Sequence, residues 1–211
     1  MKKTLLLIPL VLGLGSSAWA STCMSGTLAA YEASSFSCSI GDLTFSDFTN
    51  TPIASGGAVA PDATGVAVTP ITTGEIGLLF NAAWLANAGQ TIDAPISYDV
   101  SSPTADITDL TLEMVGTTTL TGSASVAETA SNGQNLGVTP AAFTQTVTFA
   151  PVDSLSLNKD IAVSGGTTGT GHISYVYNLF SETSPVPEPS LLILCTGLLG
   201  LVPFARRKFV R

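Results

Sequence analysis

Short stretches in which apolar and polar residues alternate recur along the middle of the chain, and many of their polar positions are threonine or serine. In one of them, Ile96, Tyr98 and Val100 alternate with Ser97 and Asp99. Because successive side chains of a β-strand point to opposite faces of a sheet, this pattern predicts strands with one buried and one solvent-facing side. The stretches that show it are 42–48, 65–69, 75–80, 96–100, 110–114, 143–149, 155–163 and 173–180.

Turn-forming dipeptides separate these predicted strands. They are Gly56-Gly57, Pro61-Asp62, Asn132-Gly133 and Gly165-Gly166. The polar stretch 129–139 around one of them reads as a long loop, and only 27–33 suggests a short helix. Many short strands at this spacing are typical of a β-sandwich. We therefore predict an all-β fold with a single β-sandwich, jelly-roll-like, over residues 21–184.

Two predicted strands have features of their own. In 143–149 the alternation turns Phe143, Val147 and Phe149 toward the core and the threonines outward. In 173–180 both faces are partly apolar, which is typical of a central strand of a sheet.

The N-terminal segment has the pattern of a secretory signal peptide. Basic residues at positions 2 and 3 precede an apolar stretch, 4–15, and Ala18 and Ala20 form an A-x-A cleavage site. We expect residues 1–20 to be removed, so that the mature chain begins at Ser21. The alternative is an N-terminal membrane anchor.

The C-terminal segment consists of a short polar motif, an apolar stretch and a basic end. The motif is Val186-Pro187-Glu188-Pro189-Ser190. The uncharged stretch 191–205 would form about 22 Å of helix, somewhat short of a hydrocarbon core of about 30 Å. Arg206, Arg207 and Lys208 in the tail 206–211 predict a cytoplasmic membrane stop. A transmembrane helix over 191–205 is expected, with a buried helix of a soluble domain as the alternative.

Pro187-Glu188-Pro189, the apolar span and the terminal basic cluster together resemble the PEP-CTERM sorting signal of Gram-negative, exopolysaccharide-producing bacteria, here over 185–211. The resemblance implies exosortase as a partner. It also implies export through the inner membrane, a membrane-anchored precursor, and then a cell-surface or secreted protein. The segment from Cys23 to Phe48 resembles the N-terminal part of many ectodomains of this family. This second likeness supports the fold and implies no activity.

The charged residues and the cysteines limit the kinds of partner that the domain can bind and the compartment in which it folds. Residues 21–184 hold 14 of the 15 acidic residues but, of the 7 basic ones, only Lys159, which leaves a net charge near −13. Such a domain has no basic footprint for nucleic acid. Cys23 and Cys38 are the two cysteines of this region, and in an exported domain we expect them to form a disulfide. A metal-binding cysteine pair is the alternative.

Catalytic chemistry finds little support in the sequence. His172 is the only histidine, and no Gly-x-Ser-x-Gly motif accompanies it in the mature region. Without further nitrogen or sulfur ligands we expect no cofactor and no zinc site. Asp106 and Asp109 are candidate calcium ligands, because carboxylate oxygens suit that ion.

We therefore predict a non-enzymatic, exported surface or extracellular-matrix protein, associated with exopolysaccharide or biofilm. One alternative is a carbohydrate-binding, lectin-like module, calcium-assisted, in which Trp84 would stack against a sugar. The other is a glycan hydrolase or lyase that uses two facing carboxylates.

Overall fold

The computed structural model describes residues 20–183, which are built almost entirely of β-strands. A short helix, α1 (Leu28–Tyr31), begins at Thr27, whose hydroxyl oxygen accepts a hydrogen bond from the backbone N–H of Ala30. The strands of this part of the chain are β1 (Ser21–Thr22), β2 (Gly26–Thr27), β3 (Ser37–Ile40), β4 (Leu43–Asn50), β5 (Ile53–Ser55), β6 (Ala67–Ile71), β7 (Ile76–Ala86), β8 (Thr91–Ser101), β9 (Asp106–Thr119), β10 (Ser123–Ala130), β11 (Asn135–Val138), β12 (Thr144–Val152), β13 (Ser154–Ser164) and β14 (Thr170–Thr183).

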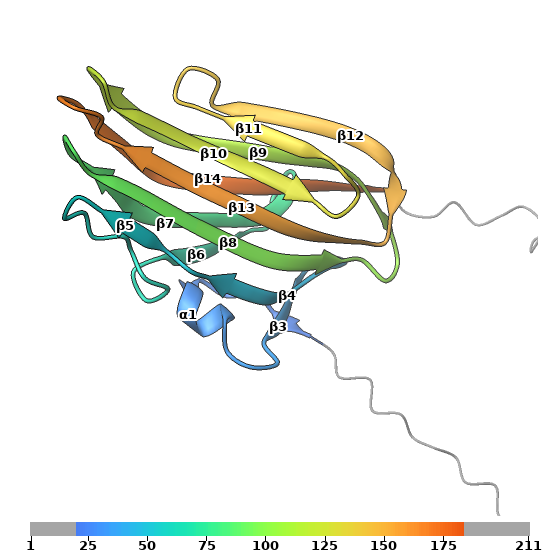
Figure 1. The fold of residues 1–211 in the computed structure, drawn as a ribbon. Helices are drawn as coiled ribbons and strands as arrows, with labels where there is room; N and C mark the ends of the chain where they lie inside the picture. Colours follow the sequence, from blue (N-terminus) through green and yellow to red (C-terminus); the bar gives the residue numbers. More distant parts are fainter. Residues whose placement is uncertain (1–19, 184–211) are drawn as a thin grey trace, which may run out of the picture.

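The strands form two sheets that face each other (Figure 1). Sheet A has the order β1-β3-β4-β8-β13-β10-β11, with β5 also paired to β8. Sheet B has the order β12-β9-β14-β7-β6-β2. Neighbouring strands are antiparallel except for β1 and β3, which run parallel. The predicted β-sandwich is confirmed, and its jelly-roll subtype stays a prediction.

From β7 onward the chain passes repeatedly from one sheet to the other. Strands β7, β9, β12 and β14 belong to sheet B, whereas β8, β10, β11 and β13 belong to sheet A. Only the β10–β11 connection stays within a sheet. Strands that are consecutive in sequence, such as β13 and β14, therefore lie in opposite layers. Their inward side chains meet across the interior.

An aromatic cluster packs the centre of the interior and joins the two layers. The ring of Tyr98 on β8 stacks on Phe48 of β4 with centroids 5.1 Å apart, and lies 5.9 Å from Phe80 of β7 in the opposite sheet. Phe45 of β4 and Phe180 of β14 make a second contact between the sheets at 6.0 Å. Such pairs add about 0.5–1.5 kcal/mol beyond the area they bury.

Three polar side chains occupy inward positions among these apolar residues. Lys159 of β13 and Glu128 of β10 face each other in register within sheet A, and Asn178 of β14 reaches them from sheet B. The ammonium of Lys159 donates to Glu128 and to the amide oxygen of Asn178, whose amide nitrogen donates to Glu128 at 2.7 Å. All three are buried. Removing one partner of such a group costs about 3–5 kcal/mol, because a buried charge is left unpaired.

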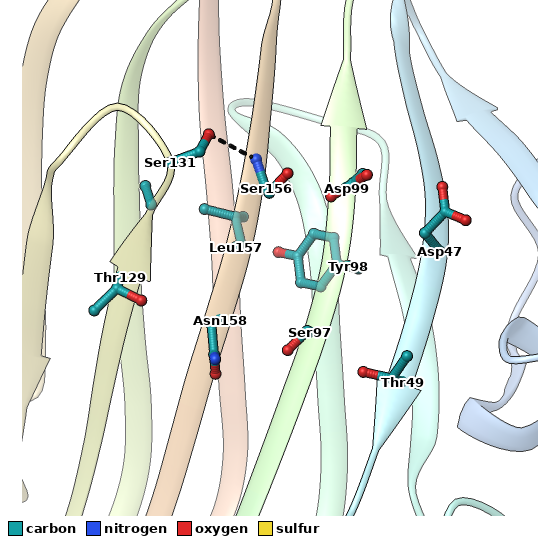
Figure 2. Close-up of a pocket in the computed structure, with 11 residues that line it drawn as sticks. Asp47, Thr49, Ser97, Tyr98, Asp99, Thr129, Ser131, Ser156, Leu157 and Asn158 are labelled. Carbon is teal, nitrogen blue, oxygen red and sulfur yellow. Dashed lines mark hydrogen bonds between the residues drawn. The ribbon is translucent and has the colours of Figure 1, made fainter.

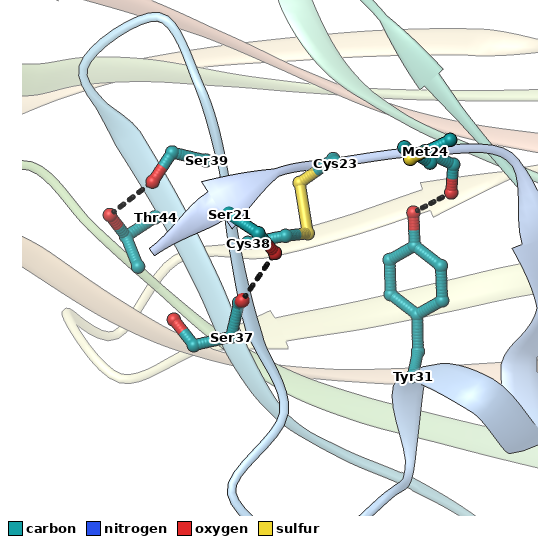
Figure 3. The surroundings of a disulfide bond; sticks show 8 residues. All are labelled: Ser21, Cys23, Met24, Tyr31, Ser37, Cys38, Ser39 and Thr44. Atoms are coloured by element: carbon teal, nitrogen blue, oxygen red, sulfur yellow. Dashed lines mark hydrogen bonds between the residues drawn. A yellow bond between two sulfur atoms is a disulfide. The ribbon is translucent and has the colours of Figure 1, made fainter. Parts of the chain in front are cut away.

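A disulfide joins Cys23 to Cys38 and fixes the N-terminal segment to the edge of sheet A, as Figure 3 shows. The two Cα atoms lie 4.7 Å apart. Close by, the hydroxyl of Tyr31 donates to the carbonyl of Met24 at 2.8 Å. The disulfide predicted from the sequence is confirmed.

Two local predictions are wrong. Residues 129–139 are not a long loop, because β10 and β11 form a tight hairpin in which the N–H of Ala130 donates to the carbonyl of Gln134 at 2.9 Å. Gly133 accommodates the turn with a φ of +88°, a value that glycine adopts without strain. Phe143 does not face the core; its side chain is 54% exposed, because it precedes β12 and lies outside the strand alternation.

Several sequence predictions lie outside the described residues. They are the signal peptide up to Trp19, the sorting motif 186–190, the span 191–205 and the basic tail 206–211. Within residues 20–183 no helix is both long and apolar enough to cross a membrane.

Replacing both Cys23 and Cys38 by alanine should lower the free energy of unfolding by about 3 kcal/mol, because the unfolded chain then regains the freedom of an open 15-residue loop. Urea titration of the variant and of the oxidised wild type measures the difference. Wild type with its disulfide reduced is the matched control and should resemble the variant. Equal unfolding midpoints for all three would show that the bond does not stabilise the fold.

Candidate functional site

The outer face of sheet A carries a shallow polar groove of about 370 Å³ (Figure 2). A row of short polar side chains crosses four strands in register there: Thr49 on β4, Ser97 on β8, Asn158 on β13 and Thr129 on β10. At one end of the groove the N–H of Ser156 donates to the hydroxyl oxygen of Ser131 at 3.0 Å. We call this surface, lined by Asp47, Thr49, Ser97, Asp99, Thr129, Ser131, Ser156 and Asn158, the polar groove.

The polar groove offers hydrogen-bonding groups but no exposed aromatic ring. Asp47, at a bulge in β4 with φ +57°, and Asp99 supply its two carboxylates. Tyr98 lies in its floor, yet this side chain is only 1% exposed because its ring belongs to the core cluster. The groove therefore suits polar groups of a ligand and has no surface for stacking. The hydrolase alternative, which needs two facing carboxylates, stays a prediction.

A second acidic feature lies farther along the same face. Asp160 on β13 and Asp93 on β8 project outward from neighbouring strands. Partial burial, a hydrogen bond with Asp93 and the repulsion of its charge together raise the pKa of Asp160. This pair lies outside the lining of the polar groove.

The outer face of sheet B is different, because it presents two aromatic rings at its centre. Tyr175 and Tyr177 stand on the same side of β14, with ring centroids 6.4 Å apart and planes tilted by 33°. On one side β9 places Val115 opposite Tyr175 and Glu113 opposite Tyr177. On the other side β7 places Asn81 opposite Tyr175. We call these five residues the tyrosine face.

A hollow of about 260 Å³ adjoins the tyrosine face. Glu113 and Val115 belong to both, and Pro140 and Phe143 line the hollow from the segment before β12. Phe143, which is exposed, and Glu113 thus line the same hollow. Aromatic surface and a hydrogen-bonding group meet at one place.

The electrostatics of the tyrosine face agree with this arrangement. Partial burial raises the pKa of Tyr177, and the carboxylate of Glu113 and the neighbouring Tyr175 raise it further. The phenol of Tyr177 therefore stays protonated at neutral pH and can donate a hydrogen bond. Tyr175 is 37% exposed, so part of its ring is open to a ligand.

The candidates from the sequence are placed elsewhere. Trp84 is fully buried in the core and is not a stacking platform. His172 is half-buried, and its Nδ1 lies 3.5 Å from the hydroxyl of Ser174. Asp109 accepts a hydrogen bond from the N–H of Ser181 at 2.9 Å, while Asp106 begins β9. Among residues 20–183 no three or more His, Cys, Asp or Glu side chains gather as a metal site.

The sequence contained a signal for the tyrosine face that the strand predictions did not use. The stretch 173–180 has apolar residues on both faces, and the tyrosines are the ones that the core leaves outside. In a β-sandwich only every second residue of a strand faces the core, and the others lie on the outer face of the sheet. The aromatic residues of the other set, Tyr175 and Tyr177, therefore belong to the outer face and not to the core.

No protein-family model matches the chain, and no curated protein matches it. Among solved structures, TmCBM61 in complex with β-1,4-galactotriose is similar over 64% of this chain and 88% of its own, with 12% identity and a TM-score of 0.35. The family 11 carbohydrate-binding module from Clostridium thermocellum, in complex with a mixed-linked tetrasaccharide, matches over 61% of this chain and 87% of its own, with 10% identity and a TM-score of 0.25. A family two carbohydrate esterase from Cellvibrio japonicus matches over 67% of this chain and 36% of its own, with 18% identity and a TM-score of 0.25. These scores are too low to indicate what this chain binds.

Asp160→Asn should stabilise the domain at about pH 7 and have little effect at about pH 3. The folded-state pKa of Asp160 is raised, so the folded protein holds this proton more tightly than the unfolded chain. Stability from this group is therefore present at low pH and is lost as pH rises through the raised value. Thermal melts across that range measure the effect. Asp153→Asn, which removes the same charge elsewhere, is the control, and an identical gain there would refute the pair as the cause.

Proposed function

We propose that the domain is a non-enzymatic glycan-binding module and that the tyrosine face is its binding surface. The observation that carries the proposal is the pair Tyr175 and Tyr177, side by side at the centre of a sheet face with Glu113 and Asn81 on either side. Tyrosine is enriched at binding surfaces because its ring supplies apolar contact area and its hydroxyl forms a hydrogen bond.

The chemistry of a sugar fits this combination of groups. A pyranose ring has apolar C–H faces that can pack on an aromatic ring, and hydroxyls around its rim that need hydrogen-bond partners. The carboxylate of Glu113 accepts hydrogen bonds, and the amide of Asn81 both donates and accepts. The hollow beside Phe143 extends the contact to a further part of the ligand.

The charge of the domain narrows the class of glycan. With a net charge near −13 over residues 21–184, the molecule repels polyanions. We infer that the ligand is a neutral oligosaccharide chain and not a uronic-acid-rich or sulfated polymer. The polar groove, which lacks an exposed ring, is the less favoured surface.

We further propose that the protein is exported and sorted by exosortase to the cell surface or the polysaccharide matrix. The Cys23–Cys38 disulfide supports an oxidising compartment. The A-x-A site before Ser21 and the Pro-Glu-Pro motif with its span and basic end support the route. In this scheme sorting delivers the domain and the tyrosine face retains it among neutral polysaccharide chains.

Tyr175→Ala and Tyr177→Ala should each weaken binding to neutral oligosaccharides by about tenfold or more, which corresponds to about 1.4 kcal/mol. A glycan array on the mature protein identifies the ligand, and calorimetric titration then measures the affinities. Tyr175→Phe keeps the ring and is the matched control; it should retain most of the affinity.

Asn158→Ala in the polar groove of the opposite sheet should leave the affinity unchanged. Loss of binding in this variant, with the tyrosine variants unaffected, would move the site to the polar groove. Absence of binding across neutral glycans would reject the glycan-binding function altogether.

Deleting residues 186–211 should abolish surface or matrix delivery in the native cells while leaving export and the disulfide intact. The deletion removes both the recognition motif and the membrane span that present the precursor to a sorting enzyme. Immunoblots of membrane, periplasmic and extracellular fractions check the result. Glu188→Gln changes only the motif and should also impair delivery. Unchanged delivery after the deletion would contradict sorting by this tail.

A further inference from the structure

Lys159, Glu128 and Asn178 form a buried polar group whose presence is not explained by the stability of the fold. Lys159 is the only lysine or arginine within residues 20–183, yet its side chain is fully buried. Burying a lone cation is costly, and an apolar residue at this position would avoid the cost. The group therefore calls for an explanation other than stability alone.

Burial makes the neutral amine of Lys159 more accessible than that of a lysine in water. The side chain is fully buried, which disfavours the charge, although the ring of Phe80, 5.8 Å from Nζ, is placed to stabilise the cation. Burial lowers the pKa of Lys159, and the attraction of Glu128 offsets this only in part. Transfer of one proton from the ammonium to the carboxylate would leave an amine and a carboxylic acid with no net charge in the core. The amine is the nucleophilic form of lysine.

The contacts place this amine against an electrophile. Nζ of Lys159 touches the side-chain amide of Asn178 at its oxygen, next to the amide carbon Cγ. One carboxylate oxygen of Glu128 contacts Nζ, and the other lies 2.7 Å from Nδ2 of Asn178. A single carboxyl group thus touches both the nucleophile and the nitrogen that would leave. General acid–base catalysis needs a group within hydrogen-bonding distance of the atoms that lose and gain the proton.

We propose that Lys159 and Asn178 form an intramolecular isopeptide bond that links β13 of sheet A to β14 of sheet B, with Glu128 as the catalytic residue. The proposal is independent of glycan binding, because it concerns the interior and not the tyrosine face.

The reaction balances without any other reagent. Glu128 takes a proton from the ammonium of Lys159, and the freed amine attacks Cγ of Asn178 to form a C–N bond. Glu128 passes a proton to Nδ2, the Cγ–Nδ2 bond breaks, and ammonia leaves. The second proton lost by Nζ ends on Glu128, which remains as a neutral acid beside the new amide. No atom is oxidised or reduced, and the ion pair becomes a neutral group.

The fold itself supplies the rate enhancement. Amines do not displace ammonia from amides at a useful rate in water, but fixed neighbours can reach effective concentrations of about 10⁵ M or more. Lys159 and Glu128 are held in register by two paired strands, and Asn178 is held by a central strand of the opposite sheet. Exclusion of water removes the competing hydrolysis.

Trypsin tests the bond directly, because the enzyme needs a free lysine or arginine side chain. The full-length chain is expressed, folded, then denatured, reduced and digested. Since Lys159 is the only trypsin site between Lys3 and Arg206, free lysine gives two large fragments on a denaturing gel, while an amide-linked lysine gives one. We expect one fragment. Two fragments from wild-type protein overturn the proposal.

Mass spectrometry identifies the linkage. The intact protein should be lighter by one ammonia molecule than its sequence with one disulfide, and chymotryptic digestion should release a branched peptide containing Lys159 and Asn178. A succinimide at Asn132–Gly133 would also lose ammonia, but it would leave Lys159 cleavable and give no branched peptide. A full-mass protein without the branched peptide again overturns the proposal.

Glu128→Gln keeps the shape of the side chain and removes its acid–base function. We expect a folded protein of full mass that trypsin cuts at Lys159, with folding checked by near-ultraviolet circular dichroism. Glu75→Gln, at an exposed site, is the control and should remain one fragment. Where Glu128→Gln does not fold, Glu128→Asp keeps the charge and should show partial conversion. Complete linkage in a folded Glu128 variant would remove this residue from the catalytic role.

Discussion

The rest of the structure depends on the contact between two apolar sheet faces. Tyr98, stacked on Phe48 in one sheet, meets Phe80 of the other, and the alternation along each strand turns the remaining apolar residues into the same interior. Because the inward side chains of both sheets form the core, the residues on the two outer faces are not needed to build it. The outer face of sheet A carries short polar side chains around Asn158, and the outer face of sheet B carries aromatic side chains around Tyr175. The difference between the two outer faces is therefore a difference in surface residues, because both sheets turn their apolar side chains inward.

At one place in the interior, the inward-facing side chains are polar and not apolar. Position 159 continues the inward series Leu155, Leu157, Ile161 and Val163, and the lysine at this position donates hydrogen bonds to Glu128 and Asn178. Buried polar groups are costly when they lose their partners, so these contacts favour the arrangement of strands that keeps the three side chains together. Since the set spans both sheets, it also fixes how the two layers sit relative to each other.

Sequence reasoning recovered the features that depend on local pattern. The alternation predicted the strands at 96–100 and 155–163, and the cysteine count predicted the disulfide. It failed where tertiary contacts decide: residues 129–139 pair as a hairpin, and Phe143 lies beyond its strand. Trp84 and Tyr175 show the same limit, because neither pattern nor residue type tells which of two aromatic side chains a core will enclose. The partners of Lys159 come from other strands, and only the fold brings them together.

The position of β14 has a mechanical consequence. This strand, the last within residues 20–183, lies in the middle of sheet B and is paired along its length to β9 on one side and β7 on the other. A load that pulls along β14 from its C-terminal end shears its two ladders of hydrogen bonds together, so that they are not peeled one at a time. Resistance to such a load is governed by the rate of unfolding and not by equilibrium stability. Under the proposed attachment at its C-terminal side, the domain would be held through a strand that is paired on both edges.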